Sequence, residues 1–236
     1  GRPLLKPALQ HGRPVPELLD QLKEYEPRTR YRARRELRDR PASDVLPALQ
    51  TWIRNLDASN PWHDLHQLEA LYVMQGHHQV DPAHLKRVLA AKTRDARALA
   101  VRILSDEFER IPDAFALLRP MVHDTDPRVR LEAVRALSFV KIPEAAETAL
   151  LVAAQPLDYW LDYTLQHTLG ALESQWKAPH QAGTFAQSNP ASREYLDSYV
   201  RGQPSIGLVA EQLKRLIEDP SMAPGQRDQL IAAVAK

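Results

Sequence analysis

The fold of this chain is decided by the stretch Asp126-Pro-Arg-Val-Arg-Leu-Glu-Ala-Val-Arg-Ala-Leu137. Asp126 carries a short acceptor side chain suited to an N-cap, and Pro127 follows at the first helical position, where a backbone N–H is not needed. Apolar residues then recur at positions 129, 133, 136, 137 and 140, which is the spacing of one helix face. Leu131 and Val134 add a second apolar strip. The stretch therefore predicts a helix that packs against neighbours on two sides.

The same spacing recurs along the chain at intervals of 33 to 34 residues. The clearest second copy matches Arg130, Ala133, Arg135 and Leu137 with Arg97, Ala100, Arg102 and Leu104. A copy three repeats earlier begins at Glu26, and Ala70 with Leu71 marks the copy between them. Proline is common (19) and glycine is scarce (8), and the prolines lie mostly between the apolar segments. This pattern predicts short helices with firm ends.

Two helices in each unit of this length predict an all-α fold, a right-handed α-solenoid of HEAT-like helical-hairpin repeats. The pattern resembles HEAT repeats most clearly at Asp124, Val129 and Arg130. In HEAT repeats an aspartate and an arginine at this spacing bond from one unit to the next. We therefore expect a structural role for the repeat-matched residues Asp124, Val129, Arg130, Ala133, Leu137, Arg97, Ala100 and Leu104.

The pattern divides the chain into four parts. Residues 1–14 contain three prolines and predict an extended lead-in, and residues 15–176 predict about five helix pairs. Residues 177–190, with Pro179, Gly183 and Pro190, predict a linker loop. Residues 191–236 predict irregular C-terminal helices at 191–200, 206–218 and 225–235 that continue the solenoid.

Composition limits the function classes. The 31 Lys and Arg nearly balance the 30 Asp and Glu, so the net charge of +1 gives no global case for nucleic acid or an anionic membrane. Cysteine is absent, which removes thiol nucleophiles, thiolate metal sites and covalent haem attachment from this chain. No apolar run is long enough to span a bilayer, and the N-terminal residues lack the apolar core of a signal peptide. We therefore expect a soluble piece of a longer protein, without membrane insertion.

The densest charge cluster is the arginine run Arg28, Arg30, Arg32, Arg34, Arg35, Arg38 and Arg40. One interpretation is a phosphate-tracking patch for nucleic acid. These arginines point all round a helix, however, and Glu24, Glu26, Glu36 and Asp39 lie near enough to pair with several of them. We favour a solvated, salt-bridged face over the nucleic-acid site, with an interdomain contact as a third reading.

Histidines offer the best metal candidates, because His63, His66 and Glu69 follow one another at single helical turns and His77 and His78 come soon after. No other repeat supplies a matching second pair, so we expect surface or capping histidines and no metal or other cofactor. No cysteine or Gly-x-Ser-x-Gly elbow indicates a nucleophile. The aromatic segment Tyr159–Tyr163 reads as a ligand face or, more typically for a repeat protein, as core. We expect no catalytic residue in this chain.

The second helix of each pair lines the concave face of a HEAT solenoid. Repeat matching places Arg35, Glu69, Arg102 and Arg135 in one row of that face and Arg32, His66 and Glu132 in the next. Charges of both signs in such rows favour a protein partner, although they also serve simply to keep the face soluble. We predict these seven residues as the partner-binding set.

Four motifs in order, at 31–37, 66–71, 129–137 and 161–165 with Trp176, resemble one family over roughly residues 15–235. It is the HEAT-repeat region of large secreted bacterial proteins described as membrane-bound dehydrogenases with a haem-binding domain. The resemblance implies a flanking β-propeller like those of quinoprotein sugar dehydrogenases and a flanking c-type cytochrome, neither of which this chain contains. It also implies a periplasmic or secreted location.

We therefore predict a non-catalytic HEAT-repeat scaffold, the middle region of a multidomain periplasmic redox protein. Its partners would be the flanking propeller and cytochrome domains or another periplasmic protein. The alternative prediction is a nucleic-acid-binding HEAT-like module that uses Arg28–Arg40.

Overall fold

The computed structural model describes residues 7–202, 214, 224–225, 227–228 and 231. The chain folds into two compact units, Gly1–Ala114 and Phe115–Lys236. All regular elements in the described residues are helices, and no strand occurs among them. The all-α prediction, a solenoid class built from helical hairpins, is confirmed. The predicted helices at 206–218 and 225–235 fall almost wholly outside the described residues.

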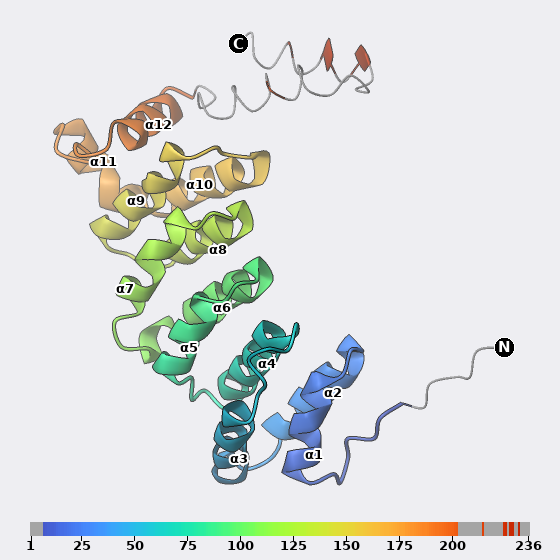
Figure 1. The fold of residues 1–236 in the computed structure, drawn as a ribbon. Coiled ribbons are helices and arrows are strands. Elements are labelled where there is room, and N and C mark those ends of the chain that lie inside the picture. The colour runs from blue at the N-terminus through green and yellow to red at the C-terminus, as the bar shows by residue number, and fades with distance from the viewer. Residues whose placement is uncertain (1–6, 203–213, 215–223, 226, 229–230, 232–236) are drawn as a thin grey trace. The chain divides into compact units, whose positions relative to one another are not determined.

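The first unit contains three helical hairpins, drawn in blue to green in Figure 1. Each hairpin pairs a first helix with a second helix. The pairs are α1 (Val15–Asp20), extended by the 3₁₀ turn η1 (Gln21–Lys23), with α2 (Pro27–Arg38); α3 (Ala42–Arg54) with α4 (His63–Gly76); and α5 (Pro82–Leu89) with α6 (Arg94–Asp106), followed by η2 (Phe108–Arg110). The second helices stack on one another, because α4 packs against both α2 and α6.

The second unit repeats this arrangement. Its elements are α7 (Ala114–Leu118), which begins at the unit boundary, η3 (Arg119–His123), α8 (Pro127–Leu137), α9 (Pro143–Leu150), η4 (Leu151–Ala154), α10 (Tyr159–Ala171), α11 (Glu173–Gln181) and α12 (Pro190–Val200). The second helices α8 and α10 pack against each other, and α9 contacts both of them. The buried hydroxyl of Tyr195 in α12 donates to Asp162 in α10 at 2.8 Å, which joins the last described hairpins.

The helix starts follow the predicted capping chemistry. Asp126 has extended backbone angles, and its carboxylate accepts a hydrogen bond from the N–H of Arg128 at 2.9 Å, with Pro127 at the first helical position. Glu26 and Asp81 cap α2 and α5 in the same way, each followed by a proline. Each such cap contributes about 1 kcal/mol to helix stability.

The core of each unit is formed by the apolar faces that the repeat pattern predicts. Val129, Ala133 and Leu137 are fully buried in α8, as are Ala100 and Leu104 in α6. Burial of a leucine side chain stabilises the fold by about 1.5–3 kcal/mol, and the alanines let neighbouring helices approach closely.

An arginine near the start of the second helix closes three of the hairpins. The guanidinium of Arg130 donates to the backbone carbonyls of Asp124 and Thr125, at 2.9 and 3.2 Å. Arg97 donates in the same way to the carbonyls six and five residues before it, at 2.9 and 3.0 Å, and Arg30 does so at 2.7 and 2.8 Å. We call Arg30, Arg97 and Arg130 the arginine clamps. Arg130 therefore contacts Asp124 through the backbone carbonyl of that residue.

The remaining hairpin of the first unit uses a histidine in place of the clamp. His63 Nδ1 lies 3.0 Å from the carbonyl of Asp57, again six residues earlier. Clamp positions therefore recur at 30, 63, 97 and 130, which is the repeat period itself. Hydrogen bonds between hairpins add to the stack: Arg130 also donates to the carbonyl of Pro156 at 3.2 Å, and the N–H of Thr93 donates to Asp64 at 2.8 Å.

The aromatic side chains of the segment Tyr159–Tyr163 do not belong to the core. Tyr159, Trp160 and Tyr163 are 54%, 64% and 50% exposed. The face of α10 that is buried against its neighbours carries Leu161, Leu165 and Leu169 instead. Spacing explains the difference, because Tyr159, Tyr163 and His167 form their own stripe along the helix outside the core. Tyr159 stacks on Tyr163, and Tyr163 lies tilted against His167.

The first residues of the linker predicted at 177–190 are helical. Helix α10 ends at Ala171, and α11 continues through Pro179 to Gln181. Proline removes only one backbone donor, and here it stands in the last turn of a short helix that packs against α9. The four-part division of the chain stays a prediction.

Arg130→Ala is expected to lower the free energy of unfolding by about 2–4 kcal/mol, because it leaves three backbone carbonyls without their donor in a buried site. Urea unfolding followed by circular dichroism measures this change. Arg32→Ala is the matched control: Arg32 is exposed on α2, and its removal is expected to cost less than about 0.5 kcal/mol. Equal stability of the two variants would contradict a structural role for the clamp.

Candidate functional site

A groove of about 510 Å³ crosses the second helices of the first unit. We call it the arginine groove. Helix α2 supplies Tyr31, Arg34, Arg35 and Arg38; α4 and the loop after it supply Tyr72, Gln75, Gly76 and His78; and the end of α6 with the following turn supplies Asp106, Glu107 and Arg110. All of these residues lie within Gly1–Ala114.

Helical spacing puts the α2 residues on one face. Arg34 and Arg35 come three and four residues after Tyr31, and Arg38 comes four and three residues after them, so the four side chains line one strip of the helix. Ala33 and Leu37 occupy the opposite strip and are fully buried. The groove is therefore the outer surface of a helix whose inner surface is core.

A buried carboxylate organises one end of the groove. Glu69 of α4 is only 3% exposed, and its two oxygens accept from Arg30 Nε at 2.9 Å and from Arg34 Nη1. The two arginines are one helical turn apart on α2, so the carboxylate joins α2 to α4. The Arg34 guanidinium also lies over the ring of Tyr72, 4.8 Å from its centre. Arg34 is thus held in place with its charge partly compensated, because it shares Glu69 with Arg30.

The opposite wall of the groove is also internally paired. Glu107 is 4% exposed and contacts His78 Nδ1 at 3.2 Å and Arg110 Nη1 at 3.1 Å. Gln75 donates to Asp106 at 3.2 Å. Burial raises the pKa of the Tyr72 hydroxyl, which keeps it as a neutral donor. This wall offers a ligand shape, hydrogen bonds and the negative charge of Asp106, but no available cation.

Two arginines of the groove remain available to an anionic ligand. The Arg35 guanidinium lies 6.0 Å from the ring of Tyr31, and no described carboxylate forms an ion pair with it. Among the described residues, the ion pair of Arg38 is with Asp39, at 3.7 Å between two exposed side chains, and such a pair contributes little. Guanidinium groups beside tyrosine rings suit bidentate binding of carboxylates.

The structure separates the seven residues of the predicted partner-binding set. Arg35 lines the arginine groove, while Arg32 and Arg102 are exposed on α2 and α6 outside it. In the second unit, Arg135 pairs with Glu132 of the same helix at 2.9 Å and lies over the exposed ring of Phe139. Glu132 is largely buried. The partner-binding role of these residues stays a prediction.

His66 and Glu69 are not surface residues, so their placement in an exposed row is wrong. His66 is 5% exposed and packs edge-on to Trp52 of α3, with ring centres 6.4 Å apart. It stands three residues after His63, at the position that Ala33, Ala100 and Ala133 occupy after their clamps, and this position faces the preceding helix. Glu69 is buried because its charge is paired with Arg30 and Arg34.

The side chains around His63 are not arranged as metal ligands in the described structure. His63 contacts the carbonyl of Asp57 and the side-chain amide of Gln67, so both its ring nitrogens have partners. Within the described part of the chain, no group of three or more His, Asp or Glu side chains is arranged to hold a metal ion.

The arginine run is salt-bridged in part as predicted. Arg40 pairs with Glu36 at 2.7 Å, and Arg38 with Asp39. The sequence interpretation missed Glu69, because it considered only acids near the run, whereas Glu69 lies 35 and 39 residues from its partners in the next hairpin. These separations are close to one repeat period, and this was the signal in the sequence that could have indicated the two pairs.

Comparison with known proteins supports the repeat assignment. Residues 82–158 match the family model of HEAT repeats, a range that includes the clamps Arg97 and Arg130. The chain therefore carries a HEAT-repeat region, and the same clamp geometry continues outside this range at Arg30 and His63. No curated protein matches the chain. Among the described residues, no helix has both the length and the hydrophobicity to cross a bilayer.

The first unit is expected to lose stability in mild acid. Burial lowers the pKa of His66 and of His84, whose Nε2 lies 2.9 Å from the carbonyl of Gln67. The unfolded chain protonates these rings near pH 6.5, before the folded chain does, so their contribution is complete above that pH and is lost as the pH falls towards the folded-state values. The slope is about 1.4 kcal/mol per pH unit for each such histidine.

Urea unfolding at pH 7.5, 6.5 and 5.5 measures this loss. In His84→Asn, which cannot take up a proton, the fall in stability between pH 6.5 and 5.5 is expected to be smaller than in the parent. Identical stability of the parent protein at pH 7.5 and 5.5 would contradict the prediction.

Proposed function

We propose that this chain is a HEAT-repeat protein-interaction module, and that its arginine groove binds an acidic segment of a partner protein. The observation that carries the proposal is the position of Arg35 and Arg38. Both lie on an exposed helix face, with Arg35 near the ring of Tyr31, while the other charged side chains of the groove are largely paired with one another. A short acidic peptide can satisfy both guanidinium groups at once.

The groove suits a protein segment better than nucleic acid. Proteins that follow a phosphate backbone make about 6–10 phosphate contacts, and the affinity depends steeply on salt. Here Glu69 partly compensates the charges of Arg30 and Arg34, Glu107 pairs with Arg110, and Asp106 lines the groove as an acid. Two available arginines on a mixed-sign surface provide too little charge for such tracking.

Fluorescence anisotropy with a labelled peptide of four consecutive glutamates flanked by Gly and Ser tests the proposal. Arg35→Gln/Arg38→Gln is expected to weaken binding at least about tenfold, because each bidentate guanidinium–carboxylate contact contributes about 1.5–3 kcal/mol. Arg32→Gln is the matched control, since Arg32 is an exposed arginine of the same helix that does not line the groove. It is expected to bind like the parent protein.

Two results would contradict this function. One is equal binding by the parent protein and the double variant. The other is tighter binding of duplex DNA than of peptide, with an affinity that falls steeply between 50 and 200 mM salt, which would favour the nucleic-acid alternative at Arg28–Arg40.

A finer proposal rests on the family resemblance at the four motifs between Tyr31 and Trp176. We propose that the chain is the non-catalytic middle region of a multidomain periplasmic redox protein, placed between a propeller and a cytochrome. Stacked hairpins suit this role, because each unit is packed continuously along its second helices.

Crosslinking mass spectrometry on the full gene product tests this placement. Lysine crosslinkers are expected to join exposed lysines of this chain, such as Lys23 and Lys86, to segments on both sides of it. Absence of crosslinks to either flanking segment would count against a scaffold that holds them. The test does not depend on the arginine groove, so the two proposals can fail separately.

A further inference from the structure

A second pocket opens on the same pair of helices as the arginine groove. It has a volume of about 330 Å³ and is lined by Tyr25, Pro27, Trp62 and Leu65, with Lys23, Glu24 and Arg30 at its margin. We call it the aromatic pocket. Tyr25 is 83% exposed and Trp62 is 54% exposed, although both are large apolar side chains. Paired exposed aromatic residues at a concave surface are typical of binding sites.

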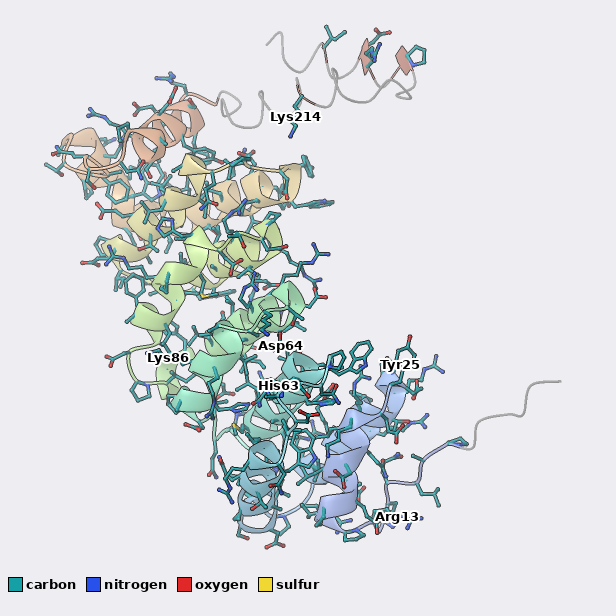
Figure 2. All side chains as sticks on the ribbon, viewed as in Figure 1. Arg13, Tyr25, His63, Asp64, Lys86 and Lys214 are labelled. Carbon is teal, nitrogen blue, oxygen red and sulfur yellow. The ribbon has the colours of Figure 1, made fainter. Side chains whose placement is uncertain are left out.

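Both aromatic residues are held by the hairpin closures. Arg30 donates to the carbonyls of Glu24 and Tyr25, which fixes the loop that carries the tyrosine. The N–H of Trp62 donates to Asn60 Oδ1 at 2.8 Å, next to the His63 closure of the following hairpin. Figure 2 shows Tyr25 just before α2 and His63 at the start of α4.

The two rings form a corner rather than a closed stack. Their centres are 6.2 Å apart and their planes make an angle of 74°. Leu65 and Pro27 complete the apolar lining between them. A rigid corner of this kind can receive a ring from a ligand without reorganising, which limits the entropy cost of binding.

Helix α2 sets the distance between the pocket and the groove. Pro27 lines the pocket, and Arg35 and Arg38 lie 8 and 11 residues further along the same helix. At about 1.5 Å per residue this separation is roughly 12–16 Å. An extended peptide covers about 3.3 Å per residue, so the same distance corresponds to about four or five residues of a ligand.

We propose that the aromatic pocket binds an aromatic side chain of the same partner segment whose acidic residues contact Arg35 and Arg38, four or five residues away. This inference rests on the proposed function of the arginine groove. It states what the partner segment must contain: one aromatic anchor, a short extended spacer and an acidic cluster. Between the two sites lies the Arg30–Glu69–Arg34 cluster, in which one carboxylate is shared by two guanidinium groups, so the cluster carries a net charge of +1.

Three labelled peptides of equal charge test the spacing. The first has one Phe, four Gly and Ser residues, and four Glu. The second has Ala in place of Phe, and the third has Phe directly beside the Glu run. The first is expected to bind about tenfold more tightly than the other two, because only it buries the ring while the acids remain on the arginines. Trp62→Ala is expected to remove this difference, and Trp160→Ala, which alters an exposed tryptophan of the second unit, is expected to keep it.

Indole N–H signals in a ¹⁵N correlation spectrum locate the anchor. The chain has four tryptophans, and the Trp62 signal is expected to move with the first peptide but not with the second, while the Trp160 signal stays in place. If all three peptides bind equally, lose affinity in Arg35→Gln/Arg38→Gln and leave Trp62 unmoved, the anchor is overturned and the groove function stands. If none of them binds, both proposals are overturned.

Discussion

The stacked hairpins depend on the bonds between a guanidinium near the start of three second helices, α2, α6 and α8, and the carbonyls five and six residues earlier. Arg30, Arg97 and Arg130 all make this contact, and His63 makes a one-nitrogen version of it. The loop between two helices of a hairpin must leave carbonyls without helical partners. One planar side chain with several donors satisfies two of them and fixes the turn, so the apolar faces of both helices meet the next hairpin correctly.

The candidate site is a consequence of this stacking. Arg30 closes its own hairpin through Nη1 and uses Nε to hold Glu69 of the next hairpin. That buried carboxylate in turn positions Arg34 in the wall of the arginine groove. A buried ion pair adds little net stability compared with apolar packing, but it specifies one geometry. We infer that the binding surface of the first unit is rigid because its base is made of repeat-closing contacts.

Several aromatic side chains take no part in the core that the repeats form. In α10 the leucines fill the core stripe, which leaves Tyr159, Trp160 and Tyr163 in solvent. In the first unit, Tyr25 and Trp62 occupy loops whose conformation is already set by hydrogen bonds. Neither group is needed to bury the apolar faces of the helices, so these side chains are available for binding.

The sequence by itself determined the features that depend on local spacing: the helix class, the cap at Asp126, and the buried Val129, Ala133 and Leu137. Period, capping and helical faces are properties of residues within a few turns of one another. Only the tertiary structure decided that Glu69 and His66 are buried, that Arg35 and Arg38 stay available, and that Tyr25 meets Trp62. Those outcomes depend on which side of a second helix faces the next hairpin, and residues a full repeat apart set that orientation.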